Sequence, residues 1–119
     1  MNANWKFLMA LSLGIAAISA PVMAHHSFAM FDANKVVELK DVTVVEFRWA
    51  NPHAFLIVKS GEQRYALECY SPSAMTSLGW KFNSVKAGDR ISVTMHPLRN
   101  GKPGGALKAA TLANGQTLG

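Results

Sequence analysis

The stretch KVVELKDVTVVEFRW, residues 35–49, decides the fold because its apolar side chains alternate with polar ones, as on a β-strand with one face turned to a core. The alternation changes phase twice along the stretch. Val37 and Leu39 share the first phase, and the second phase holds Val42 and Val44. The third phase holds Val45, Phe47 and Trp49. Each change of phase indicates a β-bulge that bends the strand. A strand bent in this way can serve both sides of a small barrel.

The segments that follow predict the rest of a mainly β fold. HAFLIVK (53–59) is apolar on both phases, and a turn at SGEQ leads into RYALECY (64–70). A short helix is predicted in SPSAMTSLGW (71–80), with Ser71 as the cap, Pro72 at the first helical position, Met75 and Leu78 on one face, and Gly79 at the end. VKAGDRISVTMH (85–96) supplies a turn and a fourth strand with Ile91, Val93 and Met95 inward, and ALKAATL (106–112) supplies a fifth, after which ANGQTLG ends the chain.

This order predicts the fold class. Three strands, a helix and two more strands match the five-stranded OB-like barrel, which closes its sheet and so limits exposed strand edges. A small open β-sandwich is the alternative, because order alone does not prove closure. We place the barrel at residues 36–119, after an extended N-terminal segment at 25–35.

The first 24 residues have the parts of a cleaved secretory signal. Lys6 precedes the apolar run FLMALSLGIAAISA, which is short for a membrane span, and PVMA ends in a small residue. Cleavage after Ala20 would place Pro21 first in the mature chain, so cleavage after Ala24 is favoured. We therefore expect a signal peptide at 1–24, a mature chain that begins at His25, and a periplasmic location. A retained membrane anchor is the alternative.

Composition narrows the partners. Removing Lys6 from the 12 basic residues leaves 11 against 7 acidic ones, a formal charge of +4, and these residues are not clustered. Nucleic acid is an unexpected partner for an exported protein, and contact with a membrane is expected only through the signal peptide during export. The single cysteine, Cys69, cannot form an internal disulfide, and its phase with Tyr65 and Leu67 predicts a buried small apolar residue.

The adjacent histidines at the predicted mature terminus are the first candidate metal ligands. A free α-amino group and the imidazole of His25 can chelate one ion within a single residue, and His26 lies next to them. Copper(II) is the ion that such nitrogen ligands favour. A solvated terminal segment without metal is the alternative.

The other two histidines, His53 and His96, lie where the barrel topology places the ends of two loops that flank one face. Together with the N-terminus they are candidate ligands of the same ion, or they bind an anion. The alternative is that His53 is a packed or hydrogen-bonded residue at the entry of a strand.

A second set of residues suggests a different kind of binding. Arg48 and Trp49 near the aromatic stretch, and Arg99 and Lys102 in the loop RNGKPGG, are candidates to hold a peptide, a glycan or a periplasmic protein without metal. The loop joins two predicted strands and does not open a helix, so a flexible hairpin tip is favoured over a phosphate-binding loop.

The sequence lacks a nucleophile elbow, a carboxylate pair and a Ser/His/Asp order, so a non-enzymatic binding module is expected. Copper-dependent oxidation at the terminal histidine is the alternative from the enzyme class. It would need open coordination positions and a second fixed histidine.

The stretches HHSFAMFD, EFRWANPHAF, LGW and HPLRNGKPGGAL together resemble a family of small exported proteobacterial proteins whose domain has no known function. The resemblance covers most of the predicted mature chain. It implies an export signal and a compact β domain, without an established activity. Members of that family usually carry glycine at the position of Asp41, which implies that this chain makes its first bend without glycine.

Overall fold

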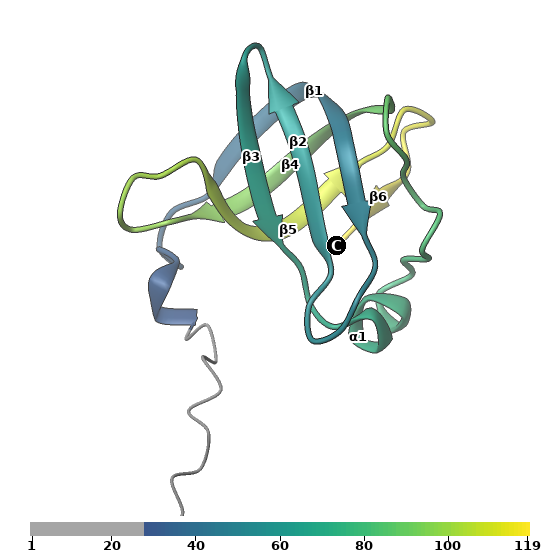
Figure 1. The fold of residues 1–119 in the computed structure, drawn as a ribbon, viewed down its shortest axis with the longest axis horizontal. Coiled ribbons are helices and arrows are strands. Elements are labelled where there is room, and N and C mark those ends of the chain that lie inside the picture. The colour runs from purple at the N-terminus through teal and green to yellow at the C-terminus, as the bar shows by residue number, and fades with distance from the viewer. Residues whose placement is uncertain (1–27) are drawn as a thin grey trace, which may run out of the picture.

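The long strand predicted from residues 35–49 is present as β1 (Val37–Arg48) in the computed structural model, which describes residues 28–119. Its pairing with β4 shifts register between Leu39 and Val42, and its pairing with β2 shifts between Val44 and Glu46. Both predicted bulges are therefore confirmed. They bend β1, which pairs with β2 along one edge and with β4 along the other, as Figure 1 shows.

The other predicted elements follow in the predicted order as β2 (Phe55–Ser60), β3 (Gln63–Glu68), α1 (Pro72–Ser77), β4 (Arg90–Pro97) and β5 (Gly104–Thr111). The structure adds two elements that the sequence analysis did not predict, a short β6 (Thr117–Leu118) and one turn of 3-10 helix at Phe28–Met30. The sheet runs β3-β2-β1-β4-β5-β6, and β3 also pairs with β5. This pairing closes a five-stranded barrel and confirms the OB-like fold in place of the open sandwich.

Closure depends on a parallel contact between β3 and β5, in which Ala66 pairs with Gly104 and Leu67 pairs with Gly105. The two glycines were expected in a flexible hairpin tip, but they are buried at the start of β5, which runs over 104–111 rather than 106–112. A Cβ atom on Gly105 would overlap the backbone oxygen of His96. Glycine lies here because neighbouring strands approach too closely for a side chain.

The barrel interior holds the apolar phases predicted from the sequence. Leu56 and Leu67 are fully buried, and Ile91, Val93 and Met95 of β4 also lie inside. Helix α1 closes one end of the barrel (Figure 1). The hydroxyl of Ser71 accepts a hydrogen bond from the Ala74 backbone amide at 3.3 Å, as the predicted cap requires.

The first bulge of β1 is made by Asp41, whose φ of 53° is in the left-handed region. Arg90 of β4 donates from Nε to Asp41 Oδ1 at 2.9 Å, and Arg90 Nη2 lies 2.7 Å from Asp41 Oδ2. The hydrogen bond from Arg90 lowers the pKa of the Asp41 carboxyl. A non-glycine residue is therefore held at a glycine-like position by a side-chain bridge to the neighbouring strand.

The segment that precedes β1 is attached to the end of β4. Phe31 forms an isolated bridge with Leu98, and the amide of Asp32 donates to the carbonyl of Pro97 at 2.8 Å. Arg99 donates from Nε to the carbonyl of Ala29 at 2.9 Å. Residues 28–32 therefore lie along the β4–β5 loop. The predicted signal peptide, His25 and His26 fall outside the described residues.

Among residues 28–119, no helix is long and apolar enough to cross a membrane.

Replacing Gly105 with Ala should lower the free energy of unfolding by about 2–3 kcal/mol, because the new Cβ meets backbone that cannot move without opening the barrel. Urea denaturation of the two proteins measures the loss. Gly61→Ala is the matched control, since Gly61 has a φ of 57° but no atom close to the added Cβ. It should cost only about 1 kcal/mol. Equal losses for the two variants would mean that close packing at Gly105 is not what closure requires.

At Asp41, replacement by Ala should destabilise the protein more than replacement by Gly. Alanine loses the bridge to Arg90 and keeps the left-handed backbone, whereas glycine loses only the bridge. We expect the melting temperature of Asp41→Ala to lie about 4–8 °C below that of Asp41→Gly. Differential scanning calorimetry checks this order, and a reversed order would contradict the role given to the backbone conformation.

Candidate functional site

A pocket of about 260 Å³ lies on the barrel wall next to the segment that contains Phe28. Polar side chains in its lining come from His53, Glu68, His96 and Lys108. The larger apolar and aromatic side chains come from Phe28, Phe31, Tyr70, Leu78 and Leu107. An apolar cavity with a few converging polar groups is the usual form of a small-ligand site.

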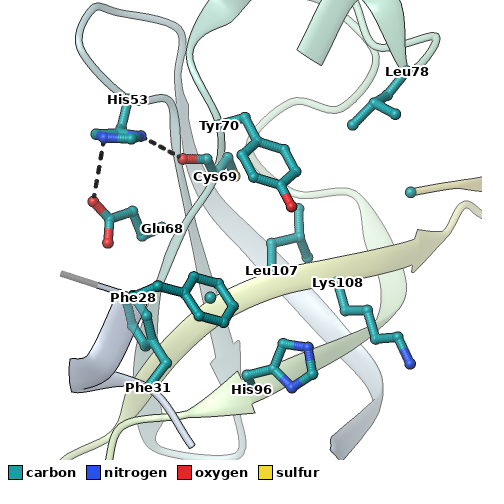
Figure 2. Close-up of a pocket in the computed structure, with 12 residues that line it drawn as sticks. Phe28, Phe31, His53, Glu68, Cys69, Tyr70, Leu78, His96, Leu107 and Lys108 are labelled. Atoms are coloured by element: carbon teal, nitrogen blue, oxygen red, sulfur yellow. Dashed lines mark hydrogen bonds and ion pairs between the residues drawn. The ribbon is translucent and has the colours of Figure 1, made fainter. Parts of the chain in front are cut away.

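Closure of the barrel assembles this pocket from distant parts of the chain. His53 belongs to the β1–β2 connection, Glu68 ends β3, and His96 belongs to β4. Figure 2 shows His53 and Glu68 at one end of the cavity and His96 at the other. The structure therefore brings both predicted histidines to one pocket, but on opposite sides of it.

Backbone contacts determine which nitrogen of each imidazole carries the proton. His53 Nδ1 lies 3.0 Å from the carbonyl oxygen of Cys69, and His96 Nδ1 lies 2.8 Å from that of Lys35. A carbonyl oxygen only accepts hydrogen bonds, so Nδ1 is the donor in both rings. In the neutral form, each Nε2 then has a free lone pair. Histidines that bind metals or accept hydrogen bonds from ligands are commonly oriented in this way.

Glu68 and Lys108 are the charged residues of the pocket that sequence reasoning missed, and Glu68 is the more buried of the two. In Glu68, one carboxylate oxygen faces His53. Its side chain is 11% exposed, and its Oε1 lies 3.9 Å from His53 Nε2, which is longer than a hydrogen bond. Within the described part of the chain, Oε1 is the one buried side-chain oxygen or nitrogen without a hydrogen-bond partner. The only sequence signal was a charged residue at the end of an otherwise apolar strand next to Cys69.

The other predicted ligand-binding residues lie outside the pocket lining. Arg48 pairs with exposed Glu46 at 3.2 Å, and Trp49 packs with its ring centroid 5.6 Å from that of Phe47. Arg99 holds the segment before β1, as described above. The amide of Lys102 donates to Asn100 within the loop.

Metal binding by the barrel alone finds no support in the described residues. No group of three or more His, Cys, Asp or Glu side chains within 28–119 is close enough to hold an ion. Cys69 is 5% exposed, which confirms the predicted buried residue, and burial raises the pKa of its thiol from 9.0 to about 12. Its thiol therefore stays protonated at neutral pH.

Comparison with known proteins gives one match. A family model described as "Family of unknown function (DUF6152)" matches residues 12–108. No curated protein and no solved structure matches the chain significantly. The matched range includes His53, Glu68 and His96.

The burial of Cys69 predicts that a thiol reagent will not label the folded protein at pH 8 until the chain unfolds, because thiolate is scarce and covered. Reaction with a chromogenic disulfide in buffer and in urea measures this. Because the pKa is raised in the folded protein, the thiol of the unfolded chain ionises at a lower pH than that of the folded chain. The free energy of unfolding should therefore fall as pH rises from about 9 towards 12. Rapid stoichiometric labelling in buffer would contradict both expectations.

Proposed function

The chain belongs to the DUF6152 family, a family of unknown function, and we propose that it is an exported, non-enzymatic periplasmic module that binds a copper ion at its mature N-terminus. The proposed chelate consists of the α-amino group and imidazole of His25, with His26 beside it. Copper(II) favours such nitrogen ligands over the other common divalent ions.

The observation that carries this proposal is the attachment of residues 28–32 to the end of β4. Phe28 lies with its ring centroid 6.0 Å from that of His96, in an edge-to-face arrangement. Two Cα–Cα steps of 3.8 Å separate His26 from Phe28, so their Cα atoms lie no more than about 7.6 Å apart. A copper ion held by His25 and His26 would therefore be tethered near the mouth of the pocket.

His96 is the barrel residue best suited to supply a further nitrogen. Its Nδ1 is engaged by Lys35, so Nε2 is the free position, and its neighbours Pro97 to Arg99 hold the N-terminal segment. His53 lies at the other end of the cavity (Figure 2). We therefore assign it no part in the copper site, which narrows the four histidines of the sequence to three.

An interaction module built on Arg48, Trp49, Arg99 and Lys102 is less well supported. Arg99 and Arg48 are both engaged within the molecule, by Ala29 and Glu46. A partner that recruited Arg99 would release the segment that carries Phe28. The contacts of these residues therefore favour a structural role for them.

Protein recovered from the cell envelope should begin at His25 and bind one copper(II) ion per chain. N-terminal sequencing establishes the first residue, and titration with electron paramagnetic resonance counts the bound ion and its nitrogen ligands. His25→Ala should weaken copper binding at least about tenfold, because the chelate ring is lost.

The two pocket histidines provide the matched comparison for this experiment. His96→Ala should weaken copper binding and reduce the number of coupled nitrogens, whereas His53→Ala should change neither. A mature chain that begins elsewhere, or equal copper affinity of His25→Ala and the unchanged protein, would overturn the proposal.

A further inference from the structure

At the end of the pocket away from His96, the carboxylate of Glu68 has an oxygen without a hydrogen-bond donor among the described residues. Glu68 Oε1 is fully covered and accepts no hydrogen bond, although its carboxylate lies in a largely apolar wall. A carboxylate whose covered oxygen has no hydrogen-bond donor is poorly stabilised in an apolar wall. A positively charged ligand beside the carboxylate would stabilise its charge.

The adjacent imidazole faces the same space as an acceptor. His53 Nδ1 donates to the carbonyl of Cys69, so in the neutral ring Nε2 presents a lone pair towards Glu68 Oε1, 3.9 Å away. Two acceptors that face each other at this distance repel unless a positive charge lies beside them, either a proton on His53 or a cationic group of a ligand. An ammonium group has three donors on one compact positive charge, and it can serve both acceptors at once.

The walls and size of the cavity indicate that the donor is part of an organic molecule. The space beside Glu68 is bounded by the aromatic rings of Phe28 and Tyr70 and by Leu107 (Figure 2). Its volume of about 260 Å³ is far larger than a bare ion needs, and it lies just below the range of about 300–1,000 Å³ that larger ligands occupy. Aromatic faces also attract organic cations directly.

Lys108 limits the charge that the occupant can carry. It also lines the pocket, and no ion pair joins it to Glu68 among the described residues. A second positive charge on the ligand would therefore be repelled from that side. The pocket fits one positive charge attached to an apolar body.

We propose that this pocket binds a small monoamine with an aromatic or aliphatic body, whose ammonium group pairs with the Glu68 carboxylate and donates to His53 Nε2. Phe28, Tyr70 and Leu107 cover the apolar part of the molecule. The site is formed by residues 28–119 alone and requires neither His25 nor a metal ion. It is therefore independent of the proposed copper chelate.

Titration of the exported protein with 2-phenylethylamine tests this site, with a chelator present to remove metal ions. Two-dimensional NMR should show saturable shifts at residues around Glu68 and Tyr70. The neutral analogue 2-phenylethanol and the anion phenylacetate should each bind at least about tenfold more weakly, because neither supplies a charged donor. This comparison uses one unchanged protein and does not depend on the folding of any variant.

Glu68→Gln removes the charge and keeps the shape of the side chain, and it should weaken amine binding at least about tenfold. Glu62→Gln is the matched control, since the Glu62 side chain is fully exposed and its ion pair within residues 28–119 is with Lys59, at 3.7 Å. It should leave amine binding unchanged. Equal binding of amine and alcohol would overturn the proposal, as would undiminished amine binding by Glu68→Gln or a lack of saturation at about 10 mM amine. Zinc(II) binding that displaces the amine and depends on both Glu68 and His53 would instead identify a metal site.

Discussion

Closure of the barrel through the parallel contact of β3 with β5 is the constraint on which the rest of the structure depends. The contact exists because Gly104 and Gly105 let β5 approach both β3 and β4 more closely than any side chain would permit. It also requires β1 to bend at two bulges, so that the sheet curls and β3 can meet β5. Without the bends the sheet would stay open, and its edges would lack partners.

The same contact creates the candidate site. Glu68 pairs in register with Ala106 at the last step of the β3–β5 contact, where β3 ends. The cavity lies beside this point, which explains why a carboxylate is buried there beside apolar side chains. His53 and His96 reach its two ends from elements that only closure brings together. The fold and the site therefore share one structural cause.

The two proposed ligands use the two ends of this cavity differently. At the His96 end, Arg99 and Leu98 hold the segment that begins at Phe28, two residues after His26. At the Glu68 end the acceptors His53 Nε2 and Glu68 Oε1 face each other without a donor between them. Copper favours the nitrogen ligands proposed for the N-terminal segment. An ammonium group favours the carboxylate and imidazole acceptors beside the aromatic rings.

Period-two patterning in the sequence was enough to predict the order of the strands, both bulges of β1 and the burial of Cys69, and Ser71 with Pro72 was enough to predict the start of the helix. These features depend on near neighbours along the chain, which is the range over which a pattern can be recognised. Tertiary structure alone decided that Gly104 and Gly105 belong to a strand, that His53 and His96 lie apart, and that Glu68 Oε1 is covered without a hydrogen-bond donor among the described residues. Each of these depends on contacts between residues far apart in sequence, which no local pattern records.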